Sequence, residues 1–252
     1  VLVYDSLENG HEYAVQGLEL IQGKTQNKEK LTQILKNKKI DAVMHFAAYI
    51  EMGESMQKPY KYFENNFYGS LQLFKAMVEA EVKKIVFSST AGVYGNPEAI
   101  PIKEEDAKKP TNPYGETKLM VEKALKWFDK IHNLKHVCLR YFNAAGANLE
   151  ATLGEDHEPE SHLIPNLIYA ALNNQEFTLF GDDYDTKDGT CVRDYIHVLD
   201  LAEAHIQALE ALKEGHLSAS YNIGTGKGYS NKEVVEMVKK VTQKDFPVKI
   251  GN

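Results

Sequence analysis

Apolar and polar positions along the chain alternate between two patterns. Short continuous apolar runs, rich in β-branched and aromatic residues, occur at residues 1–5, 41–48, 84–89 and 136–142. Longer segments with apolar residues at helical spacing lie between them, at residues 27–39, 59–80 and 112–132. Continuous apolar strands separated by helices indicate parallel pairing through right-handed crossovers. The sequence therefore predicts an α/β fold with a doubly wound, Rossmann-like parallel sheet.

The second part of the chain follows a looser pattern. Residues 146–162 are polar and loop-like, and helical patterns mixed with short strands follow near residues 163–173, 200–213 and 231–243. We therefore predict a Rossmann-like domain at residues 1–148 and a smaller C-terminal α/β lobe at residues 149–252, with the chain crossing back between them.

The candidate functional residues follow the predicted strands directly. Ligands of open parallel sheets bind in the crevice at the carboxyl ends of the strands. The positions just after the four strands are Asp5, residues 46–48, residues 88–90 and residues 142–143.

Composition and charge narrow the class of protein. A formal net charge of −7 argues against a broad nucleic-acid surface, which requires a basic footprint. No uninterrupted apolar run is long enough to cross a membrane. Cys138 and Cys191 lie far apart without metal-ligand spacing, so we predict no metal site and a reducing compartment, the cytoplasm.

The chain carries 29 basic residues but only two arginines, Arg140 and Arg193. Arginine presents a planar fork that suits phosphate or carboxylate, whereas lysine does not. Arg140 lies on a predicted buried strand and is expected to be structural. Arg193 is therefore the candidate phosphate ligand.

Tyr114 and Lys118 lie four residues apart in the predicted helix at 112–132 and so share one face. At about 4 Å and an effective dielectric constant of about 20, an ammonium attracts a phenolate by about 4 kcal/mol, or roughly three pKa units. That attraction would bring the phenol pKa from about 10 towards about 7, where it serves as a general base. The pair alone is more typical of a solvent-exposed helix face.

Other residues near strand ends favour the catalytic interpretation. Hydroxyls at Ser88, Ser89 and Thr90 follow the strand one crossover before Tyr114, although strand-end capping also accounts for them. Asp5 ends the first predicted strand of this chain, and an acid at the end of the second strand of a dinucleotide-binding fold accepts from ribose hydroxyls and disfavours a 2′-phosphate. A loop or capping role for Asp5 is the alternative.

Six blocks in order resemble a known family. They read HFAAYIEMGESMQKP, ENNFYGS, FSSTAGVYGNP, PYGETKLMVEK, LRYFNAAGA and LFGDDYDTKDGTCVRDYIHVLDLAEAH. Over nearly the whole chain the sequence resembles the UDP-glucose 4-epimerase (UDP-galactose 4-epimerase) family of the extended short-chain dehydrogenase/reductase superfamily.

The resemblance implies an NAD cofactor, a UDP-sugar substrate and a homodimer formed by the helices at 59–80 and 112–132. The catalytic residues it implies are Thr90, Tyr114 and Lys118. The cofactor-binding residues it implies are Asp5, Ser6, Leu7, Glu8, Asn9, Gly10, Phe46, Ala47, Ala48, Tyr49, Ile50, Asn65, Thr90, Tyr114, Lys118 and Phe142. The substrate-binding residues it implies are Thr90, Tyr114, Asn143, His162, Leu163, Thr178, Leu179, Phe180 and Arg193.

The implied reaction is epimerisation at C4 of a UDP-hexose through a transient 4-keto sugar. Related 4,6-dehydratases carry Asp-Glu after the hydroxyl residue, where this chain has Ala91 and Gly92. Neither residue titrates, which favours epimerisation over elimination. A related sugar-nucleotide epimerase or reductase, acting on UDP-GlcNAc, UDP-glucuronate or a UDP-pentose, remains an alternative, as does a non-catalytic nucleotide-sugar-binding protein.

The sequence departs from the family pattern at several points. No Gly-x-x-Gly-x-x-Gly loop precedes Asp5, so we expect this polypeptide on its own to bind NAD poorly. The Gly-rich residues 222–230 are interpreted as a turn before a helix. Lys24 and Thr25 stand where an acidic and an aliphatic residue are expected near adenine; Ile50 and His162 are milder departures.

Overall fold

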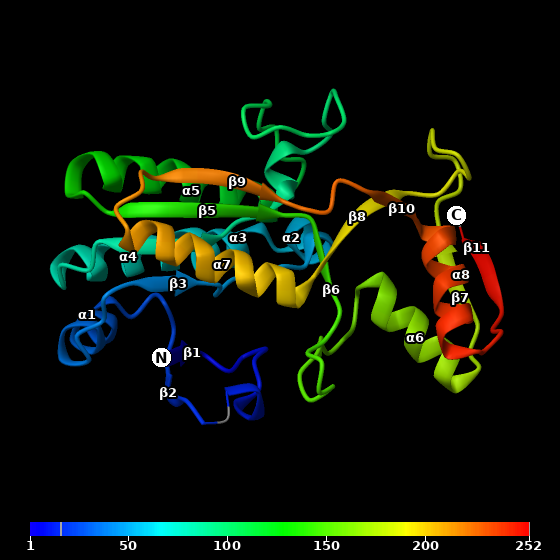
Figure 1. Cartoon of the computed structure of the whole chain (residues 1–252), viewed down its shortest axis with the longest axis horizontal. Coiled ribbons are helices and arrows are strands. Elements are labelled where there is room, and N and C mark those ends of the chain that lie inside the picture. Colours follow the sequence, from blue (N-terminus) through cyan, green and yellow to red (C-terminus); the bar gives the residue numbers. More distant parts are fainter. Residues whose placement is uncertain (16, 252) are drawn as a thin grey trace. The chain divides into compact units, whose positions relative to one another are not determined.

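The computed structural model describes residues 1–15 and 17–251, which divide into two compact units (Figure 1). The first unit comprises Val1–Tyr141 and Asp200–Ile223, and the second comprises Phe142–Leu199 and Gly224–Asn252. Across the described residues, every helix is too short or too polar to traverse a bilayer.

The first unit is built on a four-stranded parallel sheet. The strands lie in the order β3 (Val43–His45), β4 (Lys84–Ser88), β5 (Lys135–Tyr141) and β9 (Ala219–Ile223). A separate parallel pair contains β1 (Leu2–Asp5) and β2 (Glu19–Gln22), and the 3-10 helix η1 (Glu12–Val15) lies between them. The predicted α/β fold with parallel strands and crossover helices is confirmed.

Helices cover both faces of this sheet (Figure 1). On one face lie α1 (Lys28–Asn37), α4 (Gly69–Glu79) and α5 (Pro113–His132); on the other lies α7 (Val198–Lys213). Successive side chains of a strand point to opposite faces, so Phe87 packs with α4 and α5 whereas Val86 packs against α7. This alternation explains why the strand runs are apolar throughout.

The predicted helix at residues 59–80 is interrupted in the structure. It consists of α3 (Pro59–Tyr62), a π-helical segment η2 (Phe63–Tyr68) and α4, and it follows the short helix α2 (Met52–Gln57). π-Helical turns often mark functional positions. Here the turn carries Asn66, whose buried side chain accepts from Tyr49 N at 2.8 Å and donates to Tyr49 O at 2.9 Å. The irregular turn therefore holds the loop that follows β3.

The two units are not separated by a single boundary in the sequence after residue 148, because each unit contains two separate segments of the chain. Residues 142–148 belong to the second unit, and residues 200–223 belong to the first. The reason is packing: Ala208 and Leu212 of α7 contact the sheet, and β9 pairs with β5 as the last strand. The chain thus crosses between the units more than once.

The second unit contains two small sheets and two packed helices. One sheet has the order β10 (Gly228–Ser230), β8 (Val192–His197) and β6 (Asn143–Ala145), and the other pairs β7 (Phe177–Phe180) with β11 (Val248–Gly251). The helices are α6 (Leu163–Asn173) and α8 (Asn231–Thr242), which share an apolar core. A capping box of Ser230 and Glu233 starts α8, so the Gly-rich residues 222–230 form the end of β9, a turn and β10 before that helix.

Candidate active site

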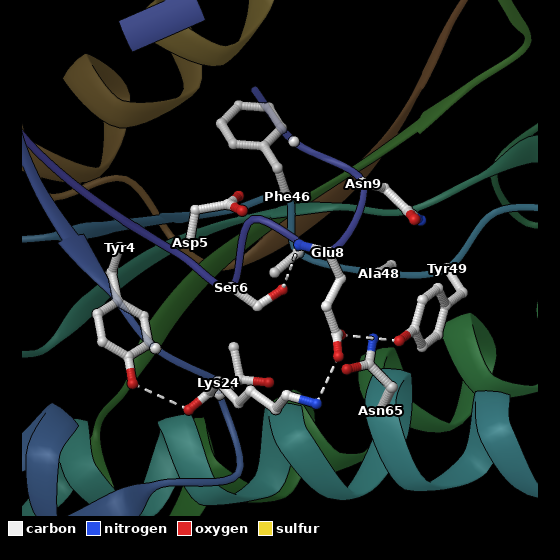
Figure 2. Close-up of a pocket in the computed structure, with 14 residues that line it drawn as sticks. Tyr4, Asp5, Ser6, Glu8, Asn9, Lys24, Phe46, Ala48, Tyr49 and Asn65 are labelled. Carbon is white, nitrogen blue, oxygen red and sulfur yellow. Dashed lines mark hydrogen bonds and ion pairs between the residues drawn. The ribbon is translucent and has the colours of Figure 1, made fainter. Parts of the chain in front are cut away.

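A pocket of the first unit lies between the loops that follow β1 and β3 (Figure 2). It brings together most of the predicted cofactor residues: Asp5, Ser6, Glu8, Asn9, Gly10, Phe46, Ala47, Ala48, Tyr49 and Asn65. Leu7 and Ile50 are not among its lining residues. Its walls also include residues that were not predicted as cofactor ligands: Tyr4, Gly23, Lys24 and Thr25.

Asp5 ends β1 and organises the loop after it. Its Oδ1 accepts a hydrogen bond from Leu7 N at 2.7 Å, so the carboxylate does cap the loop, as the alternative interpretation held. A Cβ atom at Gly10 would lie 3.0 Å from the same oxygen, which shows how closely the loop folds around the acid. A carboxylate held at a strand end, within a pocket, also suits the two hydroxyls of a ribose. The residues present therefore fit the adenosine part of NAD.

Glu8 and Lys24 form an ion pair in this pocket (Figure 2). Lys24 Nζ lies 2.5 Å from Glu8 Oε1, and Tyr49 OH donates to Glu8 Oε2 at 2.9 Å. These two hydrogen bonds hold the pKa of Glu8 below its usual value. Lys24, which stands where an acidic residue was expected, is thus paired with a carboxylate from the loop after β1, and both oxygens of that carboxylate accept hydrogen bonds.

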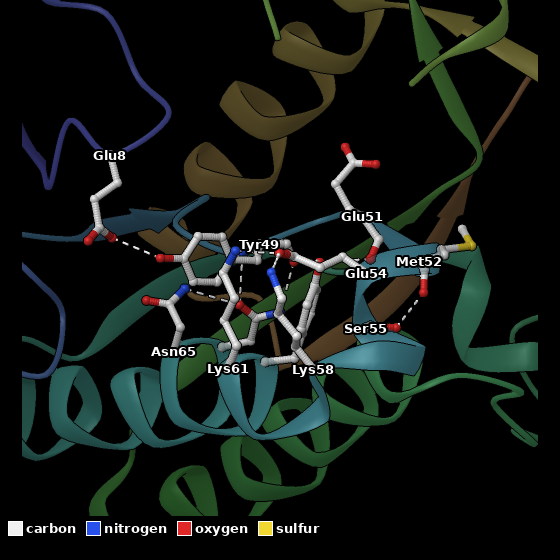
Figure 3. Close-up of polar contacts among 11 residues, drawn as sticks. Glu8, Tyr49, Glu51, Met52, Glu54, Ser55, Lys58, Lys61 and Asn65 are labelled. Atoms are coloured by element: carbon white, nitrogen blue, oxygen red, sulfur yellow. Dashed lines mark hydrogen bonds and ion pairs between the residues drawn. The ribbon is translucent and has the colours of Figure 1, made fainter. Parts of the chain in front are cut away.

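Two short helices fix the ring of Tyr49 at the pocket wall (Figure 3). Lys61 Nζ lies 3.9 Å from the ring centroid and 2.8 Å from Glu54 Oε2, while Lys58 Nζ lies 3.1 Å from Glu54 Oε1. The hydrogen bond from Lys61, followed by that from Lys58, lowers the pKa of Glu54 to about 2. Burial, followed by the bond to Glu8, raises the pKa of Tyr49 to about 12.

Tyr114 and Lys118 lie on the buried side of α5. Their exposed fractions are 6% and 2%, so the interpretation as a solvent-exposed helix face is wrong. The Asn112 side chain caps the helix by accepting from Gly115 N at 2.8 Å, which places Tyr114 in the first turn. Lys118 Nζ donates to Ser88 O at 2.7 Å, at the end of β4.

Thr90 joins this cluster from the segment after β4. Its side chain caps the 3-10 helix η3 (Ala91–Tyr94) by accepting from Gly92 N at 3.0 Å. It also hydrogen-bonds Tyr114, and this bond lowers the pKa of the phenol. The hydroxyl therefore caps the turn after β4, as the capping alternative held, and it also contacts Tyr114.

The net effect of the protein on Tyr114 differs from the prediction. Burial and then the neighbouring Tyr141 raise the pKa of Tyr114, and they outweigh the bond from Thr90. Lys118 Nζ lies 5.9 Å from the ring centroid, and burial lowers the pKa of Lys118 to about 7. A partly neutral amine at that distance attracts a phenolate weakly, so the lysine by itself does not make Tyr114 a base near pH 7.

Lys118 also connects the cluster to the pocket. Burial, followed by the charge of Lys118, lowers the pKa of His45 to about 3. His45 ends β3 and directly precedes Phe46, the first pocket residue of that loop. The cluster of Thr90, Tyr114 and Lys118 and the pocket that includes Phe46 therefore lie near the carboxyl ends of the neighbouring strands β4 and β3.

The depressed pKa of Lys118 predicts a pH-dependent difference in stability between the wild type and Lys118→Met. From about pH 7 to its ordinary value of 10.5, the unfolded chain binds one more proton at this lysine than the folded chain does. The free energy of unfolding of the wild type should therefore rise relative to that of the variant by up to about 1.4 kcal/mol per pH unit. Urea denaturation at about pH 7.5 and about pH 9.5 measures this change.

The matched control is Lys123→Met, at an exposed position of the same helix. Its difference from the wild type should be the same at both pH values. An equally constant difference for Lys118→Met would contradict a neutralised, buried amine.

One group near Tyr114, the hydroxyl of Tyr141, was not predicted from the sequence, whereas its partner Ser88 was. Ser88 Oγ and the hydroxyl of Tyr141 hydrogen-bond each other, and Ser88 also supplies the carbonyl that Lys118 binds. Tyr141 lies in the family-like block at the end of β5, one residue before Phe142. The position of Tyr141 in that block, next to Phe142, was the only feature of the sequence that could have indicated a place near the site.

Comparison with known proteins identifies the family. The sequence profile described as "NAD dependent epimerase/dehydratase family" matches residues 1–224. The UDP-glucose 4-epimerase of Halalkalibacterium halodurans is 50% identical over 252 residues, which cover 100% of this chain and 75% of that protein. The chain belongs to the NAD dependent epimerase/dehydratase family. The resemblance inferred from the six sequence blocks is thereby confirmed.

Solved structures of this epimerase/dehydratase family agree. The UDP-glucose 4-epimerase of Brucella ovis in complex with NAD has a TM-score of 0.96 and 42% identity, covering 99% of this chain and 77% of that chain. The enzyme of Stenotrophomonas maltophila, with bound NAD and formylated UDP-arabinopyranose, has a TM-score of 0.95 and 38% identity, covering 100% and 78%.

The predicted substrate residues of this family member lie largely in the second unit. Asn143, on β6, donates from Nδ2 to Asp194 O at 2.8 Å, and Arg193 is exposed on β8. The remaining ones are His162 before α6, Leu163 in α6, and Thr178, Leu179 and Phe180 on β7; Phe142, predicted to contact the cofactor, also belongs to this unit. Their grouping with Thr90, Tyr114 and Lys118 around a sugar nucleotide stays a prediction.

Proposed function

We propose that the protein catalyses NAD-dependent epimerisation at C4 of a UDP-hexose, UDP-glucose or UDP-galactose, through a transient 4-keto sugar. The observation that carries the proposal is the buried cluster of Thr90, Tyr114 and Lys118 beside a pocket suited to adenosine. Proteins named UDP-glucose 4-epimerase that match the whole chain at 50% identity support it.

The chemistry assigns a role to each residue of the cluster. NAD, when bound, supplies a positively charged nicotinamide ring that takes hydride from C4 and returns it. Tyr114 accepts the proton of the 4-hydroxyl and later gives it back, while Thr90 holds the same oxygen by a hydrogen bond. Lys118 is held by its hydrogen bond to Ser88 O, with Nζ 5.9 Å from the centre of the Tyr114 ring, and its charge is available to the site only while the amine is protonated. Because burial raises the pKa of Tyr114, the phenol needs positive charge from the assembled complex to act as a base.

Related dehydratases eliminate water with an acid–base pair that directly follows the hydroxyl residue, and this chain has no titratable side chain at those two positions. Ala91 and Gly92 follow Thr90 in η3, and neither side chain titrates. The hydroxyl cluster therefore supports oxidation and reduction at one carbon without a second proton transfer at a neighbouring carbon.

The test is turnover by the purified protein with added NAD. We expect UDP-galactose and UDP-glucose to interconvert, measured by chromatography of the nucleotide sugars. Interconversion of only UDP-GlcNAc, UDP-glucuronate or a UDP-pentose would assign the site to a related epimerase. Binding of UDP-sugars without turnover would replace the proposal with a non-catalytic binding protein.

We also propose a homodimer in the cytoplasm. Large apolar side chains are exposed on the outer helices of the first unit: Tyr60, Tyr68, Trp127 and Ile131 are 69%, 48%, 60% and 66% exposed. Such a surface suits burial against a second copy. Both cysteines are free thiols, as a reducing compartment favours. Light scattering of the purified protein separates a dimer from a monomer, and a monomer at all concentrations would rule the dimer out.

A further inference from the structure

The loop that leads into α6 gathers four side chains with potential metal-ligand atoms, of which only His162 has a predicted role in the proposed reaction. They are Glu155, His157, Glu160 and His162, all in the second unit. One potential metal-ligand atom from each lies within 4.8 Å of the others. Two imidazoles and two carboxylates thus converge on one point within an eight-residue stretch of chain.

The two imidazoles present the same nitrogen to the same two carboxylates. His157 Nδ1 lies 3.3 Å from Glu155 Oε1 and 3.7 Å from Glu160 Oε1. His162 Nδ1 contacts Glu155 Oε1 and lies 3.8 Å from Glu160 Oε1. The rings stand at 70° to each other with centroids 5.4 Å apart, so their Nδ1 edges meet without the rings stacking.

One of these nitrogens lacks a hydrogen-bond partner. His157 Nδ1 is buried from solvent and makes no hydrogen bond of acceptable geometry to any described residue, even though carboxylate oxygens lie close. A buried polar atom without a partner costs about 1–3 kcal/mol unless something else binds it. An ion at the centre of the cluster would satisfy it.

The surrounding chain holds the carboxylate and the loop in place. Glu160 Oε1 accepts from Ser161 N at 2.7 Å and from His162 N at 2.8 Å. Asn166, in the first turn of α6, donates from Nδ2 to His162 O at 2.9 Å and to Glu160 O at 3.2 Å. Such outer contacts orient the side chains that bind a metal.

The donor set identifies the class of ion. Calcium and magnesium prefer sites made of oxygen atoms, whereas zinc takes imidazole nitrogen and carboxylate oxygen in tetrahedral sites. Bonds of about 2.0–2.1 Å in a tetrahedron place ligand atoms about 3.3 Å apart. Three of the nitrogen–oxygen separations here are 3.3, 3.7 and 3.8 Å, and the contact between His162 and Glu155 is closer and would open when an ion binds. A divalent ion also offsets the repulsion between the two carboxylates.

We propose that Glu155, His157, Glu160 and His162 bind one Zn²⁺ ion and thereby hold the loop at the start of α6. The expectation of no metal site rested on the spacing of the two cysteines, neither of which belongs to this cluster. The proposal shares His162 with the predicted substrate residues, but its test measures metal affinity and not turnover, so the two can fail separately.

The test is calorimetric titration of chelator-treated protein with Zn²⁺. We expect one ion per chain, and we expect His157→Ala and Glu155→Gln each to weaken binding at least 10-fold. Mg²⁺ at the same concentrations should not compete. The matched control is His216→Ala, which removes an exposed histidine that also lies near a glutamate, 3.8 Å from Glu214, but outside any such cluster. It should bind Zn²⁺ as the wild type does.

The visible absorption of bound Co²⁺ provides a second measurement, which keeps the test decisive if one variant folds poorly. Co²⁺ in place of Zn²⁺ should give the intense visible absorption of a tetrahedral site in the wild type and in His216→Ala, and this absorption should be lost in Glu155→Gln. Absence of stoichiometric Zn²⁺ binding by the wild type, or equal binding by His157→Ala and His216→Ala, would mean that the four side chains form ion pairs only, and would overturn the proposal.

Discussion

Tyr114→Phe should lower kcat for interconversion of UDP-galactose and UDP-glucose by about 10²–10⁴-fold, the usual contribution of a positioned general base. The substitution removes one oxygen, the only group of this side chain that exchanges a proton. The ring stays buried at 6% exposure, so the fold and the pocket around Asp5 should be unchanged. Initial rates measure the loss of kcat, and the amount of NAD bound by the variant and by the wild type shows whether the pocket is unchanged.

The matched control is Tyr60→Phe, which removes the same oxygen from a tyrosine that is 69% exposed on α3. Its kcat should equal that of the wild type. A Tyr114→Phe variant that retained more than about one tenth of the wild-type kcat would be incompatible with a general base at this position.

Arg140→Met should lower the free energy of unfolding by about 3–5 kcal/mol, because it leaves a buried carboxylate without its partner. Arg140 donates from Nε to Glu122 Oε1 at 2.9 Å and from its terminal nitrogen to Glu122 Oε2 at 2.6 Å. The two side chains are 3% and 2% exposed. Arg140 also donates to Tyr94 OH at 2.7 Å, and Ser89 donates to Glu122 at 2.6 Å. Urea denaturation monitored by circular dichroism measures the loss.

Two further variants separate the buried charge from packing. Arg140→Met combined with Glu122→Met should recover most of the loss, since apolar replacement of both partners of a buried pair is often neutral or stabilising. Lys109→Met breaks an exposed pair with Glu98, with side chains 69% and 84% exposed, and should change stability by at most about 1 kcal/mol. If Arg140→Met cost no more than Lys109→Met, the network would not be a stabilising element.

The local pattern of the chain was enough to predict the regular elements that carry the site. The strand predicted at residues 84–89 is β4, and the helix predicted at 112–132 is α5, with its cap at Asn112. Both follow from short-range physics, since a continuous apolar run requires burial on two faces and an N-cap satisfies free backbone N–H groups. The helix at 59–80 was predicted only in outline. Its π-helical turn at Phe63–Tyr68 carries Asn66, which hydrogen-bonds the backbone of Tyr49. Tyr49 belongs to another segment, so the periodicity of residues 59–80 gave no indication of this contact.

The predicted pocket residues illustrate the same limit. Asp5 and Phe46 were found because strand order places the carboxyl ends of parallel strands at one edge. Lys24 was noticed only as a departure from the family pattern. Its pairing with Glu8 joins two segments that have no fixed sequence relation, so the sequence contained no signal for it.

By itself, the amino-acid sequence determined the α/β class, the places where strands end, the Tyr114-x-x-x-Lys118 pair and the family to which the chain belongs. Only the tertiary structure decided that Tyr114 and Lys118 are buried, that residues 200–223 return to the first unit, and that Arg140 faces Glu122. The physical reason is that periodicity and spacing act within a few residues, whereas burial, pKa and ion pairing depend on which distant segments exclude water from a side chain.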